Sequence, residues 1–320
     1  MAHHTTLTTP RPGQPGRPAA PLRPQRRRRT LSNSRSALGR AVVAPALILL
    51  TVFFFLPVAL MLWMSLHRWP LLGKITFIGP GNYVAAFQDQ NFLHAAGFTL
   101  IYTLIMTPLL LVIGIALALL IRRPGKASRV FQSIYFLPVV VGFAAAGYLW
   151  LFMAQPNIGP LLDLLTRGGM ASHSDNWFGS LAGALGIVCA MVVWKVAGMQ
   201  MLLLNSGLQS IPVELEEAAR IDGASRTQVF RYIILPLLRP TLALVLVFSV
   251  AGSLLAFDQF FIMTSGGPAN QTITAVYHIY RVSFLGFQLG YGAALSTLLM
   301  IVLAVVSAIQ MLILRNSDHN

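Results

Sequence analysis

Carboxylates are the densest group in this chain that could do chemistry, and nearly half of them lie in one short segment. Charged residues make up only 10% of the 320 residues, yet four of the nine acidic ones fall between positions 214 and 222. They are Glu214, Glu216, Glu217 and Asp222, and the run from Glu217 reads Glu-Ala-Ala-Arg-Ile-Asp-Gly-Ala. A short, patterned loop of this kind between two long hydrophobic segments is typical of a docking surface.

The rest of the chain lacks the motifs that enzymes use. It contains no Gly-x-x-x-x-Gly-Lys-Ser/Thr phosphate loop, His-Glu-x-x-His pair, Cys-x-x-Cys pair or Gly-x-Ser-x-Gly motif. The seven histidines are scattered, so their spacing does not favour a metal site. The only cysteine, Cys189, lies in a hydrophobic run, which excludes an intramolecular disulfide. We therefore predict that the chain is not an enzyme acting alone, and that it holds no metal or cofactor of its own.

The docking segment is predicted to form a helix, a tight turn and a second helix. Pro212 can open the first helix, because its missing N–H falls where helical donors are unpaired. Gly223 can end it in the left-handed conformation. Ser225 and Gln228 have the spacing of a capping box and start the second helix. The apolar face of this second helix is predicted to consist of Phe230, Ile233, Ile234 and Leu237. Pro236 and Pro240 are predicted to end it.

The hydrophobic segments that flank this loop predict an all-α membrane protein. Hydrophobic residues make up 56% of the chain, and several runs exceed the roughly 20 apolar residues that a membrane-crossing helix needs. The runs are continuous rather than alternating, which favours helices over barrel strands. Six transmembrane helices are predicted, near residues 41–66, 96–121, 130–153, 181–206, 240–263 and 290–314.

The net charge is +14, and the distribution of Lys and Arg along the chain indicates how it is oriented in the membrane. Eighteen Lys and Arg residues lie in the N-terminal tail, alternate loops and the C-terminus, against four in the remaining loops. This asymmetry predicts cytoplasmic N- and C-termini and no nucleic-acid partner. Residues 1–40 are predicted to be a disordered basic tail, either merely solvated or attracted to membrane lipid. The helical domain is predicted over 41–315, with the cytoplasmic loop at 210–239 between spans 4 and 5 and a short cytoplasmic tail at 316–320.

The loop resembles the Glu-Ala-Ala motif of membrane permease subunits of ATP-binding-cassette importers. In that family the loop is a coupling helix that sits in a groove of a separate ATPase subunit. The resemblance implies that the residues coupling this chain to the ATPase are Glu217, Ala218, Ala219, Asp222 and Gly223. Several flanking stretches are similar to the carbohydrate-uptake, maltose-transporter-like branch of the family. They are Trp194-Lys195-x-x-Gly198, Gly207 to Pro212, Gly266-Gly267-Pro268 and Gly290 to Ser296.

A stripe of small residues in span 5 is the first candidate for the solute path. Ser249, Gly252, Ser253 and Ala256 recur at helical spacing, which fits either close helix packing or a recessed wall. The resemblance favours a recessed wall, because the matching face lines the sugar site in the maltose-type subunit. In span 3 the resemblance breaks down, since Val139 and Phe143 replace polar sugar contacts. Phe143 could still stack on a sugar ring.

Span 4 adds Trp194, Lys195 and Met199 to this path by the same resemblance. A lysine within a span must face water, a partner or the protein interior. Lys195 is predicted either to hold an anionic group of the solute or to pair with an acid such as Asp258. Outside the membrane, residues 272–287 predict a short interfacial helix, either an aromatic belt or a seat for a solute-binding protein.

Together these observations predict a multi-pass permease subunit in the cytoplasmic membrane of a prokaryote, importing a sugar or related polyol. The resemblance implies three kinds of partner chain: a second homologous permease, two copies of an ATP-binding subunit that bind ATP and Mg, and an extracytoplasmic solute-binding protein or lipoprotein. Three alternatives stay open. The first is the same machinery with a phosphate-bearing cargo such as a glycerophosphodiester. The others are a secondary transporter or channel working alone, and a membrane anchor or scaffold.

Overall fold

The computed structural model describes residues 42–122, 125–156, 158–169 and 176–315. The chain divides into two units, residues 1–56 and 57–320. The predicted tails, 1–40 and 316–320, lie outside the described residues. In the first unit the described chain is helical and includes a π turn, η1 (Thr51–Phe55), after which α2 (Leu56–Ser65) begins.

Four helices of the described chain are long and apolar enough to cross a membrane, namely Val42–Ser65, Gln90–Leu120, Leu181–Gln209 and Leu289–Ile313. Two bent pairs raise the number to as many as six if each pair is one span. The pairs are Lys126–Val140 with Phe143–Met153, bent by 98°, and Arg226–Leu237 with Arg239–Leu254, bent by 72°. An all-α membrane protein is therefore confirmed. The count of six and the cytoplasmic placement of both termini stay predictions.

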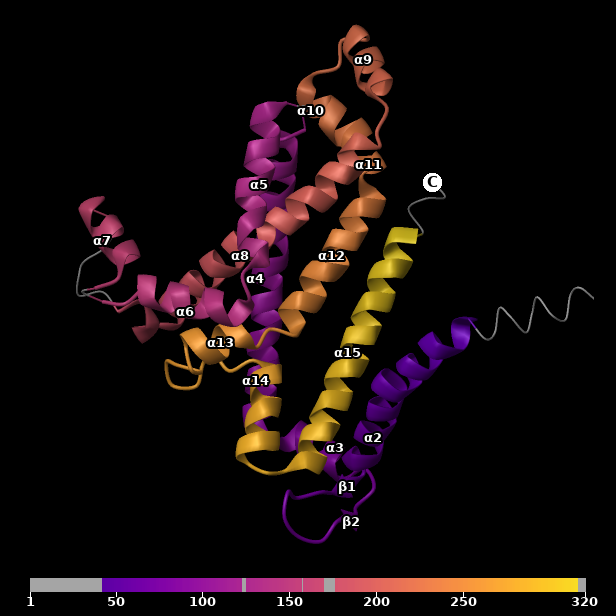
Figure 1. Cartoon of the computed structure of the whole chain (residues 1–320), viewed down its shortest axis with the longest axis vertical. Coiled ribbons are helices and arrows are strands. Elements are labelled where there is room, and N and C mark those ends of the chain that lie inside the picture. Colours follow the sequence, from indigo (N-terminus) through magenta and orange to yellow (C-terminus); the bar gives the residue numbers. More distant parts are fainter. Residues whose placement is uncertain (1–41, 123–124, 157, 170–175, 316–320) are drawn as a thin grey trace, which may run out of the picture. The chain divides into compact units, whose positions relative to one another are not determined.

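Helices α4 (Gln90–Leu120), α8 (Leu181–Gln209), α12 (Arg239–Leu254) and α15 (Leu289–Arg315) form the framework of the second unit. Helices α4, α8 and α12 pack against one another, and α15 packs on α12 (Figure 1). Asp89 begins α4 by accepting a hydrogen bond from the amide of Asn91, and Ser180 begins α8 in the same way through Gly183. Their buried contacts include Tyr102 and other large side chains of the main core.

The predicted third and fifth spans are not single straight helices. The third consists of α5 (Lys126–Val140) and α6 (Phe143–Met153), which meet at Val141 and Gly142. The fifth ends with α12, and the short helix α13 (Asp258–Met263) follows separately. Hydrophobic patterning cannot register such breaks, because both arms of a bent span are equally apolar.

The remaining elements lie at the two ends of the second unit. At one end are α9 (Val213–Ile221), α10 (Arg226–Val229), η3 (Phe230–Ile234) and α11 (Leu235–Leu237). At the other are β1 (His67–Arg68), β2 (Thr76–Phe77), α3 (Gly81–Gln88), α14 (Ala275–Tyr280) and η4 (Arg281–Leu285) (Figure 1). The strands pair antiparallel, His67 opposite Phe77. Helix α7 (Pro160–Arg167) lies against α6, and η2 (Trp177–Gly179) lies against α8.

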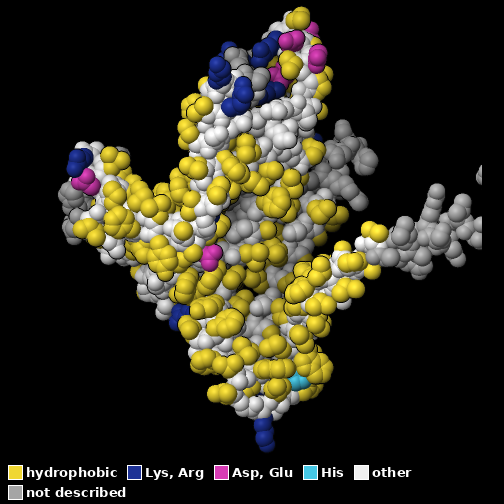
Figure 2. Space-filling model, in the orientation of Figure 1, with side chains coloured by type: hydrophobic (Ala, Val, Ile, Leu, Met, Phe, Trp, Pro, Cys, Tyr) yellow, Lys and Arg dark blue, Asp and Glu magenta, His cyan; other side chains and the backbone are white. Residues whose placement is uncertain are grey.

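Charged side chains gather most densely around the end that carries α9 and α10, and hydrophobic side chains cover much of the flank next to it (Figure 2). An exposed apolar flank is what a bilayer solvates, whereas charged groups are costly there. The surface therefore agrees with helices that stand in a membrane and a polar hairpin that projects beyond it.

Candidate functional site

The helix–turn–helix predicted for residues 212–235 is present. Helix α9 ends at Ile221, and Gly223 has a φ of +87°, a left-handed conformation that costs glycine little. Ser225 accepts a hydrogen bond from the amide of Gln228, whose side chain accepts one from the amide of Ser225. This capping box starts α10 as predicted. Four of the five predicted coupling residues are exposed, namely Glu217, Ala218, Asp222 and Gly223, and Ala219 is half-buried.

The inner side of the hairpin rests on a hydrophobic cluster. Val229, Ile234 and Leu238 of the hairpin join Ala118 of α4 and Leu208 of α8. The predicted apolar face was wrong at its last position, because Leu237 is exposed and Leu238 is buried. The π turn η3 inserts one extra residue per turn, which shifts the later side chains around the helix.

The ends of the second hairpin helix also differ from the prediction. Pro236 lies within the continuous helix Arg226–Leu237 and does not close it. The bend falls at Leu238, and Pro240 stands in the first turn of α12, where its missing N–H costs nothing.

Glu216 is the residue of this hairpin that sequence reasoning missed. Its side chain is only 9% exposed and accepts hydrogen bonds from both terminal nitrogens of Arg122, one of them at 3.1 Å from Nη1 to Oε2. Arg220 lies 3.9 Å away on the same helix. Consecutive residues of an α-helix point about 100° apart, so Glu216 and Glu217 face different directions. The angle between neighbouring helical residues, rather than the number of acidic residues, was the feature that could have identified Glu216 from the sequence.

A cavity of about 200 Å³ lies among α4, α8 and α12. Five of the seven predicted solute-path residues line it: Phe143, Met199, Ser249, Gly252 and Ser253. A side chain added at Gly252 would meet nothing within 4 Å, so the glycine faces open space.

The cavity also has polar groups that sequence reasoning did not single out. Gln200 donates to the hydroxyl of Ser249 at 2.7 Å, and its own Oε1 has no hydrogen-bond partner among the described residues. Gln259 donates to the hydroxyl of Tyr102 at 3.5 Å. Amides inside long apolar helices are common packing residues, and only the fold brings these ones to one cavity.

Lys195 does not line this cavity. It is 5% exposed, and its ammonium donates to the backbone carbonyls of Val141, Val139 (3.4 Å) and Pro138 (3.5 Å). It also lies 4.6 Å from the ring centre of Phe143. These carbonyls lie at the end of α5, where the helix dipole favours a cation; the Pro138 carbonyl also accepts from the amide of Val141. Among the described residues Lys195 forms no ion pair with Asp258. The prediction of an acidic partner is therefore wrong, and the bend between α5 and α6 supplies its partners.

Trp194 also stands apart from the cavity. Its ring packs 6.0 Å from that of Trp150 in α6, and about a third of it is exposed.

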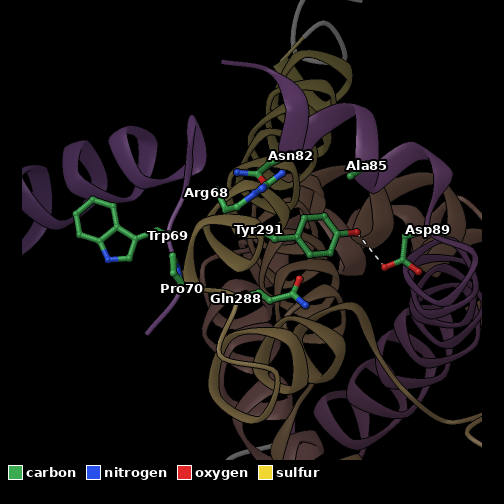
Figure 3. Close-up of a pocket in the computed structure, with 8 residues that line it drawn as sticks. All are labelled: Arg68, Trp69, Pro70, Asn82, Ala85, Asp89, Gln288 and Tyr291. Atoms are coloured by element: carbon green, nitrogen blue, oxygen red, sulfur yellow. Dashed lines mark hydrogen bonds between the residues drawn. The ribbon is translucent and has the colours of Figure 1, made fainter. Parts of the chain in front are cut away.

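At the opposite end of the unit a second pocket, of about 540 Å³, is lined by Arg68, Asn82, Gln288, Tyr291 and Asp89, among others (Figure 3). The Tyr291 hydroxyl points at Asp89 and donates to its Oδ2 at 2.9 Å. A neighbouring hollow of about 790 Å³ includes His94, Asn270 and Arg281.

The segment predicted as a helix over 272–287 is α14 followed by the π turn η4. Tyr277 is buried, its ring 5.9 Å from that of Phe257 and 5.4 Å from that of Phe261. Tyr277 therefore packs inward, whereas Phe284 and Phe287 of the same segment are exposed.

Asp89 connects three helices at this end. It caps α4, it accepts from Tyr291 of α15, and its Oδ2 lies 3.4 Å from Nε2 of His278 in α14. Burial acts to raise the pKa of Asp89, but these hydrogen bonds and His278 outweigh it and hold that pKa below its usual value. Burial lowers the pKa of His278, and the Asp89 carboxylate offsets this only in part.

Across the residues the structure describes, no group of three or more His, Cys, Asp or Glu side chains could hold a metal ion. Cys189 is a buried free thiol.

The helices, the cavity between them and the projecting hairpin define a membrane transport component that docks to another protein. Residues 98–317 match the family described as "Binding-protein-dependent transport system inner membrane component". The chain belongs to this family, and is the permease subunit of an ATP-binding-cassette transporter of the inner membrane rather than its ATPase, so ATP is bound by the partner.

Individual relatives agree with this membership. The chain is 34% identical over 284 residues to the sn-glycerol-3-phosphate transport system permease protein UgpA of Brucella suis, covering 87% of this chain and 94% of that protein. It is equally identical over 281 residues to the sulfoquinovosyl glycerol transport system permease protein SmoG of Agrobacterium fabrum, covering 87% and 90%. A chain of a bacterial transporter that imports alginate has the same fold, with a TM-score of 0.76, 22% identity and coverage of 88% and 96%.

Proposed function

We propose that this permease imports an uncharged sugar or related polyol through the cavity among α4, α8 and α12. The observation that carries the proposal is that this mostly apolar cavity holds a few polar side chains, none of which is charged. Its described lining residues include hydroxyl and amide groups and no Lys, Arg, Asp or Glu. A site of this kind favours solutes whose hydroxyls form hydrogen bonds with its hydroxyl and amide groups. Phe143 and Phe248 offer faces on which a sugar ring can stack.

The proposal assigns energy transfer to the exposed face of α9. Glu217, Ala218, Ala219, Asp222 and Gly223 contact an ATPase dimer, whose closure on ATP moves the hairpin and switches the spans from inward-open to outward-open. A second, homologous permease completes the path, and a solute-binding protein delivers cargo beside α14. The exposure of four of these residues supports the assignment, as does the family description, which names binding-protein-dependent transport.

A phosphate-bearing solute is the second candidate, because the UgpA relatives belong to sn-glycerol-3-phosphate systems. The cation that favoured this cargo in the sequence, Lys195, is occupied by backbone carbonyls. The two candidates separate in a competition assay on the complete transporter. If the proposal is right, an excess of neutral sugar alcohols should inhibit uptake of the transported solute. Inhibition by glycerol 3-phosphate alone would show that the site binds anionic solutes instead.

The coupling assignment is tested by Glu217→Lys in the complete transporter. We expect normal membrane insertion with loss of uptake and of ATP hydrolysis stimulated by the binding protein. Asp163→Lys on α7 is the control, because Asp163 is an exposed acid outside the hairpin whose ion pair with Arg167 contributes little. Normal transport by the Glu217→Lys variant would remove the hairpin from the coupling path.

A further inference from the structure

An ion pair between residues far apart in the sequence joins the hairpin to the end of α4. Arg122 follows the last turn of α4 and Glu216 lies in α9, 94 residues later. Both terminal nitrogens of the guanidinium meet both carboxylate oxygens, and the two side chains are 22% and 9% exposed. A bidentate arginine–carboxylate pair sets the orientation of its partners as well as their distance.

The other contact between the hairpin and the spans does not set orientation in this way. Val229 and Ile234 pack with Ala118 in a cluster of aliphatic side chains. Hydrophobic burial is itself non-directional, whereas the bidentate ion pair adds a contact of defined orientation. The ion pair is therefore the element that ties a movement of α9 to one movement of α4.

Helix α4 leads directly from this pair to the cavity. It is a continuous helix from Gln90 to Leu120, and it contributes Tyr102 and Leu110 to the cavity lining. Its Gly114 lies against Gln200, since a side chain added at Gly114 would stand 3.2 Å from Oε1 of that residue. A displacement of the Arg122 end would reach Gly114 and Leu110 first, because Pro108 lies inside the helix between them and Tyr102.

We infer that Arg122 and Glu216 are positioning residues that transmit the movement of the coupling hairpin to the cavity wall through α4. The inference rests on the proposed coupling role of α9 and extends it from the docking face to the path. Glu216 faces inward to α4 while its neighbour Glu217 faces outward. In this inference Glu217 contacts the ATPase, and Glu216 transmits the resulting movement to α4.

The test uses a reporter in the cavity, so it requires no knowledge of the cargo. The complete transporter carries Gly252→Cys in a Cys189→Ser background, which leaves one thiol in this chain, at a position facing open space. The rate at which a membrane-permeant maleimide labels this chain is measured with and without ATP and vanadate. With Arg122 present, we expect the rate to change by at least about fivefold, the low end of ordinary coupling between sites.

Arg122→Gln should abolish this ATP-dependent change while co-purification with the ATPase and basal ATP hydrolysis persist. The double variant Arg122→Glu with Glu216→Arg should restore it, and Arg122→Lys should restore only part, since lysine cannot bind both oxygens. Arg167→Gln, which breaks the exposed pair on α7, is the matched control and should change nothing.

The outcomes separate this inference from the proposed coupling role. If Glu217→Lys abolishes the labelling change and Arg122→Gln keeps it, the ion pair is not a transmission element and only this inference is overturned. If Glu217→Lys keeps the change, the coupling role itself fails. If both Arg122→Gln and the charge swap fail to assemble with the ATPase, the pair is a structural requirement and the inference is also overturned.

Discussion

Gly198 is the position at which a single methyl group should separate two helices. It lies in α8 against α5, and a Cβ built there would stand 1.9 Å from the carbonyl oxygen of Tyr135 and 2.6 Å from its carbonyl carbon. Both atoms are backbone, so no side chain can turn away to relieve the overlap. Helices α5 and α8 would have to part by about 1.5 Å before this contact reached ordinary van der Waals separation.

We expect Gly198→Ala to destabilise the protein by about 2 kcal/mol, within the ~1–3 kcal/mol range of overpacked interiors. That corresponds to a fall of roughly 4–8 °C in the thermal unfolding midpoint. The assay is thermal unfolding of the purified protein in one detergent at one scan rate, because membrane proteins often unfold irreversibly. The shift should be accompanied by weaker ordering of the α5–α6 bend, since Lys195 binds the carbonyls of α5 from the turn before Gly198.

Gly186 provides the control on the same helix. A Cβ there meets nothing within 4 Å, so Gly186→Ala should be neutral or should stabilise by up to about 1 kcal/mol through helix propensity. If Gly198→Ala unfolds at the same temperature as Gly186→Ala, the close approach of α5 and α8 is not present in the folded protein and the reasoning fails.

Three further predictions concern other parts of the molecule. Gly223→Ala places a Cβ at a φ of +87° and should weaken the hairpin by about 1 kcal/mol, measured as faster amide hydrogen exchange over residues 213–229. Lys195→Met should lower uptake of charged and neutral solutes alike, because it removes the cation from the carbonyls that end α5, and a loss confined to anionic solutes would contradict this. Because the folded pKa of His278 lies below its ordinary value of 6.5, its stabilising contribution is complete above 6.5 and is lost as the pH falls through the folded pKa. Amide exchange in α14 should therefore accelerate on acidification, and His278→Asn should remove that dependence.

The coupling hairpin could be predicted from the sequence because local rules decide its form. Gly223 ends a helix and Ser225 with Gln228 begins another whatever surrounds them. The apolar runs likewise predicted where helices lie, since each run in lipid must satisfy its backbone hydrogen bonds within itself. These features require no knowledge of which segments meet.

Features that depend on two distant segments could not be predicted in the same way. The partners of Lys195 are carbonyls more than fifty positions away, and they can bind its ammonium only because α5 ends at a bend that hydropathy does not register. Sequence reasoning named Asp258 as a partner because acidic side chains are visible in a sequence. Every residue has a backbone carbonyl, so a sequence does not show which carbonyls can bind a cation. Gln200 escaped notice for a similar reason, since only the packing of α8 against α4 and α12 leaves its oxygen unpaired.

Helix α4 connects the polar contacts at its two ends with the wall of the cavity. Asp89 joins one end to α14 and α15, Arg122 joins the other to α9, and Tyr102 lies between them on the cavity wall. A helix of 31 residues is about 46 Å long, enough to cross the hydrocarbon core of a bilayer with both ends outside it. Both polar junctions can therefore be strong without placing an unpaired charge in lipid. A transport cycle that moves α4 must accommodate or break the junction at each end, so the proposed coupling role of α9 makes α4 the mechanical link between the hairpin and the opposite end of the unit.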